Sequence, residues 1–447
     1  MITQKVMHIG LDDTDSAKGG CTTYLAALLV ERLGEYKIQF IDYPLLIRLN
    51  PNVPWKTRGN GALCLRFRYQ ADFEREIKEA ALSLWIENSS VNEKGTDPGI
   101  VFLEGQKIPE EITAFSKRTE TEVVTLREAL ALIRKFGGEA CGFNSCRGII
   151  GALAAIGETL YGDHTFELIA YRAKQNWGSK RQVDAASIFE MDKQLQPLTF
   201  NNVDFEKKRV IITPRGPDPV LFGIRGETAD VVKRAFGMVK SLEPVERCVI
   251  FRSNQGTDSH LRAVQKLSDI QQYDSVIAKG VVSQNPRIVP LRHVIFSIKD
   301  ATAEVDCAAY EPTGDLRKIA RELSVGDSIE VYGAAHRAKK DRRLTVNLEK
   351  IHILNVALKT LSVNPLCPYC GKRLKSMGKG QGFRCEKCRR KFRDLRKVVV
   401  TFPRSMKPGL YVTSPGSQRH LTKPIRRYGL EKADASSVLL ISDWHQP

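Results

Sequence analysis

The sequence predicts a multidomain α+β protein that contains a small β-barrel and ends in a zinc ribbon. Its 447 residues exceed what one hydrophobic core usually serves, which suggests three or four domains. Helical and strand-like apolar patterns alternate through the first half, five strand-like runs lie between residues 276 and 354, and two Cys-x-x-Cys pairs follow. The first pattern predicts mixed α and β domains, the second the barrel and the third a metal-binding module.

A strand, a turn and a helix open the chain. Residues 6–10 form a short apolar run that predicts a strand, and residues 24–33 carry apolar side chains at helical spacing. Thr22 or Thr23 is expected to cap the helix, because a hydroxyl there can accept a hydrogen bond from an unpaired backbone amide. The segment between strand and helix is therefore predicted to be a turn.

The turn is unusually acidic, since Asp12, Asp13 and Asp15 occupy three of four positions. One Asp would be an ordinary turn or capping residue, but three close carboxylates repel one another unless a cation lies between them. Oxygen ligands suit magnesium, which often arrives with a nucleotide. Gly19 and Gly20 precede the helix, whose exposed amide groups and positive dipole end favour phosphate. The turn is predicted to bind magnesium and nucleotide phosphates, although it is not a Walker motif.

A second phosphate-binding pattern, Arg58-Gly59-Asn60, stands just before another strand-like run. Arginine can neutralise phosphate in a transition state, and glycine lets the main chain approach it. Further along, small residues in 141–157 lead into an Ala-rich helix that could pack closely. Strand-like runs at 166–172 and within 215–227 alternate with Gly and Pro turns, which predicts an α+β unit.

A polar loop at 251–261 follows the apolar run CVIF. It concentrates hydrogen-bonding side chains around Gly256, either as an ordinary loop or as a contact to RNA backbone or base edges. The residues predicted to contact RNA are Arg252, Asn254, Gln255 and His260.

Five strand-like runs and one helix predict the barrel. The runs are residues 276–283, 293–300, 303–310, 327–336 and 344–354, with a helical pattern at 313–324 between the third and fourth. This order is typical of an OB-fold, which commonly holds single-stranded or structured nucleic acid, although other five-stranded barrels exist.

The paired cysteines predict a structural zinc site with four thiolates, Cys367, Cys370, Cys385 and Cys388. Four cysteine ligands leave zinc no open position for catalysis, so the metal would stabilise the fold. Basic residues surround the pairs and are expected to bind nucleic acid: Lys372, Arg373, Lys375, Lys379, Arg384, Lys387, Arg389, Arg390 and Lys391. The other six cysteines show no metal spacing and are expected to be free thiols.

The positive charge is concentrated at one end. Residues 361–447 contain 19 Lys and Arg against 5 Asp and Glu, a net charge of +14 out of the total +18, whereas residues 1–119 have a net charge of −1. This distribution favours a polyanion-binding end joined to a nearly neutral catalytic end, although a basic tail can also serve solubility alone. With neither a bilayer-length apolar run nor a signal-peptide pattern, we expect a cytoplasmic protein without a membrane partner.

In serial order these segments resemble the archaeal tRNA-isoleucine 2-agmatinylcytidine synthetases. The resemblance rests on GLDDTDSAKGGCTTYLA, TRGNGA, RGIIGALAAIG, ELIAYR, RGPDPVLFGIRGE and FRSNQGTDSHL, followed by the barrel and the zinc ribbon, and it covers essentially the whole chain. It implies an ATP-binding kinase-like catalytic domain (1–134), a ferredoxin-like domain with the agmatine site (135–258), an OB-fold tRNA-binding domain (259–358), a zinc ribbon (359–400) and a basic C-terminal tRNA-binding region (401–447).

The resemblance also implies an ATP-dependent ligase that forms AMP and pyrophosphate. Such enzymes replace the 2-oxo group of the wobble cytidine in the CAU-anticodon isoleucine tRNA with agmatine, which changes codon specificity from AUG to AUA. Because that oxygen is a poor leaving group, phosphoryl or adenylyl transfer to it must precede attack by the amine, and either transfer is open. Two rival functions remain: a non-enzymatic tRNA or single-stranded nucleic-acid-binding protein, and a nucleic-acid kinase that uses the same ATP site.

Residue roles follow from the matching motifs. Thr22 would become phosphorylated, and ATP and magnesium would be held by Asp12, Asp13, Asp15, Gly19, Gly20, Arg58, Gly59 and Asn60. Agmatine carries a guanidinium group, so its pocket needs a carboxylate. The candidates are Glu158, Asp163 and Glu167.

Overall fold

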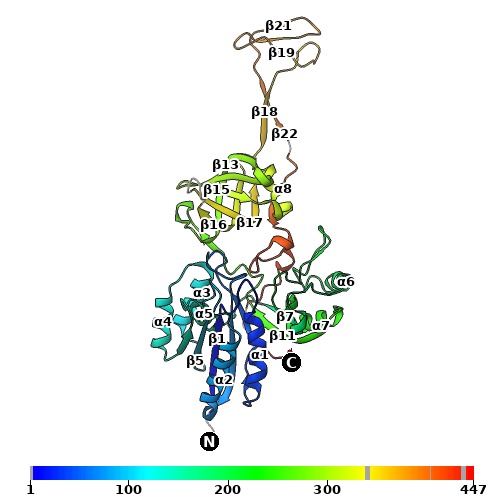
Figure 1. The fold of residues 1–447 in the computed structure, drawn as a ribbon. Helices are drawn as coiled ribbons and strands as arrows, with labels where there is room; N and C mark the ends of the chain where they lie inside the picture. Colours follow the sequence, from blue (N-terminus) through cyan, green and yellow to red (C-terminus); the bar gives the residue numbers. More distant parts are fainter. Residues whose placement is uncertain (1–3, 338–342, 403, 434–438) are drawn as a thin grey trace.

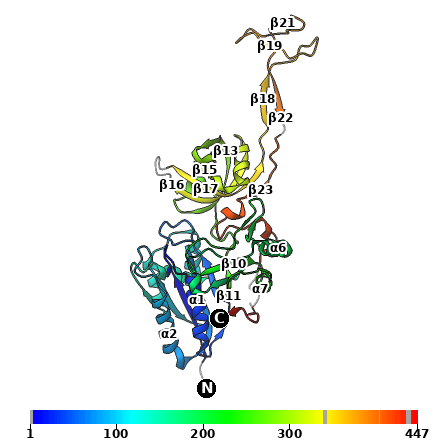
Figure 2. The ribbon, with the colours of Figure 1, turned by 45° about the vertical axis from the view of Figure 1, so that its right-hand side comes forward.

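The computed structural model describes residues 4–337, 343–402, 404–433 and 439–447. Figure 1 shows a broad α/β body at the base, a β-barrel above it, and a small β module at the far end of a two-stranded stalk. The view in Figure 2 shows the same separation of the three parts. The multidomain α/β organisation expected from the sequence is therefore confirmed. None of the helices in the described ranges is long and apolar enough to cross a membrane.

One ten-stranded sheet is the framework of the body. Its strands are β1 (Gln4–Asp12), β2 (Gln39–Phe40), β3 (Leu45–Arg48), β4 (Gly61–Gln70), β5 (Gly99–Glu104), β6 (Glu139–Gly142), β7 (Thr165–Arg172), β10 (Val220–Gly226), β11 (Val245–Ser253) and β24 (His445–Gln446). The main order is β10-β7-β11-β3-β4-β1-β5-β6. β11 and β3 pair in parallel and so join the two halves of the body, while β6 pairs with β5 and extends the first half beyond residue 134.

Helices cover both faces of this sheet. They are α1 (Thr22–Gly34), α2 (Glu74–Glu87), α3 (Glu110–Thr121), α4 (Leu126–Lys135), α5 (Gly148–Gly157), α6 (Ala185–Leu195) and α7 (Ala229–Met238). Successive residues of β4 enter two different cores: Leu63 and Leu65 pack with α1 and α2, whereas Ala62 and Cys64 pack with α3, α4 and α5. This alternation follows from the two-residue period of a strand buried on both faces.

Small residues let α5 approach the sheet closely, as expected for residues 141–157. A Cβ atom on Gly151 would lie 1.9 Å from Asp12 Oδ2, so no larger residue fits without movement of the aspartate. The N-terminal half of α5 therefore lies against the end of β1, where the acidic turn begins.

All five predicted strands and the predicted helix are present in the barrel. They are β13 (Ser275–Val289), β14 (His293–Lys299), β15 (Glu304–Ala309), α8 (Asp315–Glu322), β16 (Ser328–Arg337) and β17 (Leu344–Asn355). The sheet order is β13-β14-β15-β17-β16, and pairing of β13 with β16 closes it. β12 (Arg262–Val264) pairs beside β13.

The stalk consists of β18 (Lys359–Val363) and β22 (Val398–Phe402), which pair in antiparallel fashion. It carries a three-stranded module of β19 (Lys375–Ser376), β20 (Phe383–Arg384) and β21 (Lys391–Phe392). The chain then returns: β23 (Gly409–Val412) pairs with β17 of the barrel, and β24 pairs with β11 of the body. We call residues 409–433, which run from the barrel into the body, the C-terminal strap.

Candidate active site and zinc centre

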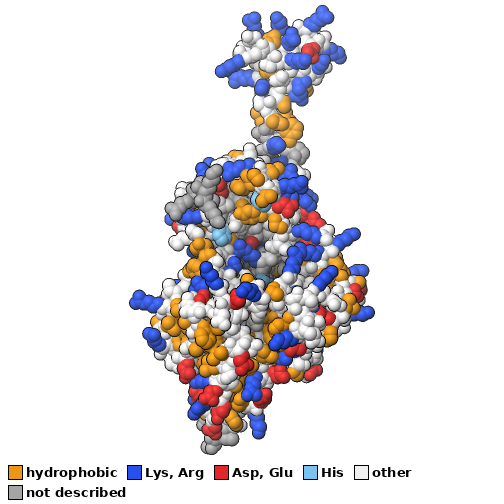
Figure 3. Space-filling view, in the orientation of Figure 1, with side chains coloured by type: hydrophobic (Ala, Val, Ile, Leu, Met, Phe, Trp, Pro, Cys, Tyr) orange, Lys and Arg blue, Asp and Glu red, His pale blue; other side chains and the backbone are white. Residues whose placement is uncertain are grey.

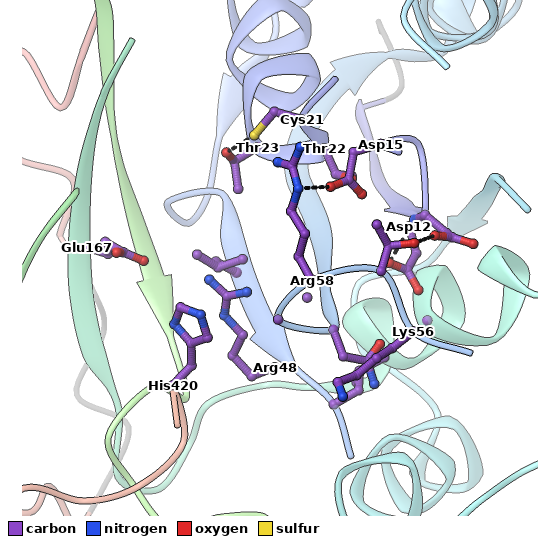
Figure 4. Close-up of a pocket in the computed structure, with 18 of the residues that line it drawn as sticks. Asp12, Asp15, Cys21, Thr22, Thr23, Arg48, Lys56, Arg58, Glu167 and His420 are labelled. Carbon is purple, nitrogen blue, oxygen red and sulfur yellow. Dashed lines mark hydrogen bonds and ion pairs between the residues drawn. The ribbon is translucent and has the colours of Figure 1, made fainter. Parts of the chain in front are cut away.

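A cavity of about 470 Å³ lies where the two halves of the body and the C-terminal strap meet. Figure 4 shows the acidic turn and the start of α1 on one side of it, with Arg48, Glu167 and His420 on the other. Arg58 extends between the two sides and points toward Asp15. The cavity thus brings together residues separated by more than 400 positions in the sequence.

The three predicted aspartates all line this cavity. Burial and the neighbouring Asp13 hold the pKa of Asp12 well above its usual range. Burial also raises the pKa of Asp13, to about 6, and that of Asp15. These shifts mean that the charged carboxylates are costly without a compensating cation.

Two of the carboxylates are held by neighbouring groups. Asp13 accepts hydrogen bonds from the Thr57 hydroxyl and the Asp97 amide, each at 2.9 Å, and Asp15 lies 3.3 Å from Arg58 Nε. The carboxylate oxygens do not converge as three ligands on one point. One or two of them still fit magnesium, which commonly keeps several waters and phosphate oxygens as its other ligands.

The prediction that Thr22 or Thr23 caps α1 is wrong. Cys21 occupies the cap position without a side-chain bond to the helix, and Thr22 is the first helical residue. Its hydroxyl instead accepts a hydrogen bond from the Thr14 hydroxyl at 3.0 Å. Thr22 is therefore turned toward the acidic turn and lines the cavity beside it.

The Arg58-Gly59-Asn60 loop also lies where the sequence placed it. Arg58 and Asn60 have φ values of +48° and +50°, and Arg58 donates hydrogen bonds to the carbonyl oxygens of Ser16 and Gly20. This loop therefore contacts the backbone between the aspartates and α1. At Gly59 a Cβ atom would lie 2.8 Å from Arg48 Nη1 and 2.9 Å from the His420 ring, so glycine is needed for close packing.

The three carboxylates predicted to bind agmatine have different surroundings. Glu167 lines the cavity, with Arg225 Nε 3.2 Å from its Oε1 and Gln255 bonded to its Oε2. Glu158 is buried, accepts a hydrogen bond from Lys117 and does not line this cavity. Asp163 is paired with Arg427, so of the three only Glu167 is placed to meet a ligand there.

Sequence reasoning missed several residues of the cavity. Arg48, Asp218, Arg225 and His420 all line it, and Asp218 lies between Arg181 and Arg58 at 3.0 and 3.5 Å. Asp218 and Arg225 belong to the segment 215–227, which supplied a strand and turn pattern and one motif of the family resemblance but no predicted site residue. No local spacing indicates His420, because the strap reaches the cavity only after the chain has passed through the barrel and the stalk.

The predicted RNA contacts of the loop 251–261 do not fit its structure. Arg252 donates to Asp42 and to the Leu160 carbonyl, and Asn254 bonds both the amide and the carbonyl of Arg48. Gln255 bonds Glu167, while His260 lies 3.2 Å from Glu349. All four side chains are buried, so they hold the loop to its neighbours and do not face a macromolecule.

The four paired cysteines meet as predicted. Their sulfur atoms lie within 4.8 Å of one another, and among the described residues this is the only such cluster of at least three His, Cys, Asp or Glu ligands. Four thiolates in this arrangement fit structural zinc. The surrounding basic side chains are exposed, and Figure 3 shows Lys and Arg projecting around the module while Asp and Glu gather toward the base.

The acidic cavity could bind a nucleotide with its metal ion, and the basic zinc ribbon could bind nucleic acid. Together they are typical of a nucleotide-dependent enzyme that acts on nucleic acid. Three family models match the chain: the TiaS TCKD domain over residues 8–145, the TiaS FLD domain over 146–260 and the TiaS C-terminal zinc ribbon domain over 364–406. The chain belongs to the TiaS family, whose members are named tRNA(Ile2) 2-agmatinylcytidine synthetases.

Relatives match nearly the full length. The Methanocaldococcus jannaschii synthetase is 42% identical over 94% of this chain and 98% of its own, and the Archaeoglobus fulgidus synthetase is 42% identical over 95% and 98%. The crystal structure of the TiaS-tRNA(Ile2)-ATP complex has a TM-score of 0.85 at 40% identity, covering 95% of this chain and 97% of that one. The TiaS-tRNA(Ile2)-AMPCPP-agmatine complex has a TM-score of 0.84 at 38% identity, with the same coverage.

Proposed function

We propose that this protein is an ATP-dependent ligase that joins agmatine to carbon 2 of the wobble cytidine of tRNA(Ile2), forming 2-agmatinylcytidine. The observation that carries the proposal is the cavity, which unites the acidic turn, Thr22, Arg58 and Glu167 in a chain that matches the synthetases over nearly its full length. The tRNA would carry a CAU anticodon, and the product would read AUA in place of AUG. A function in tRNA modification agrees with the cytoplasmic location expected from the sequence.

The acidic side of the cavity would hold the nucleotide. One or two of the carboxylates of Asp12, Asp13 and Asp15 would hold magnesium, which when bound supplies positive charge to the triphosphate. Arg58 adds a guanidinium on the same side, and the amide groups at the start of α1 favour phosphate oxygens. Thr22 presents a hydroxyl at this position and is the proposed phosphorylation site. These roles are supported by the convergence of the residues on one cavity.

The chemistry requires a better leaving group at carbon 2. Transfer of a phosphoryl group, or of an adenylyl group with release of pyrophosphate, from ATP to the cytidine oxygen would provide it. The agmatine amine would then attack carbon 2 and lose a proton, and the oxygen would leave as part of phosphate or AMP. Arg58 and the backbone at Gly19 and Gly20 would stabilise the charge that develops during the transfer. We assign the guanidinium end of agmatine to Glu167, because this buried carboxylate faces the cavity, with Asp218 as a second carboxylate in reach of the same space.

The two outer parts would bind the tRNA. We assign the barrel to the OB-fold class because its helix lies between the third and fourth strands and β13 closes on β16. The body would then comprise the kinase-like and ferredoxin-like domains that share one sheet. Exposed cations on the zinc ribbon would hold the phosphate backbone far from the chemistry, while the wobble base leaves the anticodon stack to enter the cavity.

One incubation tests this function against its two rivals. The protein would be mixed with ATP, magnesium, agmatine and CAU-anticodon tRNA(Ile2), and the nucleosides would be weighed by mass spectrometry. We expect a gain of agmatine at the wobble position that requires ATP and is absent when the wobble cytidine is replaced by uridine. A gain of phosphate alone would identify a kinase, and an unchanged mass would favour a non-enzymatic binder.

A further inference from the structure

The C-terminal strap forms one wall of the cavity. After β23 the strap passes the cavity through Pro415, Gly416, Gln418 and His420, and Gln418 accepts a hydrogen bond from Asn201 at 2.8 Å. The strap backbone is fixed there, because the Gly256 amide donates to the His420 carbonyl at 2.8 Å. The His420 side chain is therefore delivered to a defined position among residues of the body.

The His420 ring lies beside the two partners of Glu167. Its Nδ1 is 3.0 Å from Arg225 Nη2 and 3.0 Å from Gln255 Oε1. Arg225 and Gln255 each make one contact to Glu167, from Nε and Nε2 respectively. His420 thus touches both groups that orient the carboxylate, while its other edge packs against Gly59.

The contact with Arg225 has a specific chemical consequence. An arginine beside a carboxylate tends to pair through two nitrogens, and Arg225 would then occupy both oxygens of Glu167. Here Arg225 reaches Glu167 through Nε, while Nη2 is directed to His420. Burial, together with the nearby Arg48 and Arg225, holds the pKa of His420 well below its usual range. A neutral ring that carries its proton on Nε2 accepts the hydrogen bond from Arg225 through Nδ1, and in this tautomer Nδ1 does not donate to the nearby Gln255 Oε1.

We propose that His420 is a positioning residue that keeps the Arg225 guanidinium from closing over Glu167, and so reserves this carboxylate for the guanidinium of the amine substrate. The inference rests on the proposed function, because it takes Glu167 as the agmatine-side carboxylate. Removal of His420 frees Nη2 to turn toward Glu167, where it competes with agmatine. The ATP side of the cavity keeps its residues.

Three substitutions separate this role from simple packing. Asn can place its Oδ1 near the position of Nδ1, whereas Gln reaches toward the position of Nε2 and Leu offers no acceptor. We expect H420L and H420Q to raise the KM for agmatine about tenfold, as for loss of one charge-assisted contact, and H420N to stay within about threefold of wild type. In H420L and H420Q the KM values for ATP and tRNA should change less than the KM for agmatine does, although the His420 ring also packs against Gly59 on the ATP side.

The measurements are steady-state KM values for each substrate, with melting temperatures to confirm folding and K407A, an exposed residue just before the strap, as the control. The inference is overturned if H420L and H420Q leave the agmatine KM within twofold of wild type, or if H420N raises it as much as H420L. A wild-type enzyme that adds no agmatine to tRNA would instead refute the proposed function itself. If the wild-type enzyme is active and the variants keep its KM for agmatine, only the role of His420 is refuted.

Discussion

Arg427 and Asp163 join the C-terminal strap to the body by two hydrogen bonds, from Nη1 to Oδ2 at 3.0 Å and from Nη2 to Oδ1 at 2.7 Å. The Arg427 side chain is fully buried and also bonds Glu227 through Nε at 2.6 Å. Lys432 adds a contact to Glu227 at 3.2 Å. Basic residues that the sequence assigned to tRNA binding thus hold the strap against the body, next to the wall that it contributes to the cavity.

The first prediction concerns this ion-pair cluster. R427M should lower the free energy of unfolding by about 3 kcal/mol, because it removes the buried cation that bonds both Glu227 and the partly buried Asp163 and leaves only the weaker contacts of Lys432 and Lys423 to them. Urea denaturation would measure the change. R75M removes an exposed arginine on α2 and should alter stability by less than about 0.5 kcal/mol. Equal changes in the free energy of unfolding for R427M and R75M would show that the buried ion pairs of Arg427 stabilise the protein no more than an exposed arginine does.

The second prediction separates chemistry from binding. D12N and T22A should each abolish agmatine addition while tRNA affinity stays within about twofold of wild type, because in the proposed function the tRNA would be held mainly by cations far from the cavity. Product mass and filter binding measure the two quantities. D72N, an exposed carboxylate outside the cavity, is the matched control and should remain active. Full activity of T22A would remove this hydroxyl from the mechanism.

The third prediction follows from the raised pKa of Asp13, which is about 6 in the folded protein. Between the ordinary carboxyl pKa and about pH 6, the folded state binds more protons at this site than the unfolded chain does. The contribution of Asp13 to stability is therefore greatest at low pH and decreases as pH rises through this window. In denaturation without magnesium or nucleotide, D13N should lose this part of the pH dependence. Parallel wild-type and D13N curves would contradict the shift.

The fourth prediction tests the zinc ribbon. C367S, or treatment with a strong chelator, should remove the metal and weaken tRNA binding, since the small module has only a minor apolar core of its own. Binding of an ATP analogue should persist, because the cavity lies beyond the stalk and the barrel. Elemental analysis, filter binding and calorimetry supply the three readouts. C141S, at an exposed cysteine far from the ribbon, should retain both zinc and tRNA affinity.

The predicted site residues that the structure does bring together come from local patterns. The spacing of the four cysteines, the acidic turn and the Arg58-Gly59-Asn60 loop each occupy a few consecutive positions, so their geometry follows from a short stretch of backbone. The five barrel strands and α8 were likewise predicted by periodicity, because each spans enough residues for its apolar pattern to be recognised.

The errors arise where distant segments meet. A polar loop normally faces water, but Asn254 satisfies both backbone groups of Arg48, which makes its burial favourable and removes it from the surface. In the same way, the partners of Asp163 and Glu167 come from residues 427, 225 and 255, which no local pattern associates with them. Thr22 was expected as a possible cap of α1, whereas it is the first residue of the helix after Cys21 and its hydroxyl bonds Thr14.

The zinc ribbon is inserted between two strands that both belong to the barrel, since the chain leaves after β17 and returns as β23 beside it. The length of the two five-residue strands of the stalk consequently sets the distance between the ribbon and the barrel. Each residue added to both strands would move the ribbon outward by about 3.3 Å and turn it with the twist of the strands. In the proposed tRNA-binding role of the ribbon, the length of these two strands would therefore set how far from the barrel the ribbon contacts the RNA.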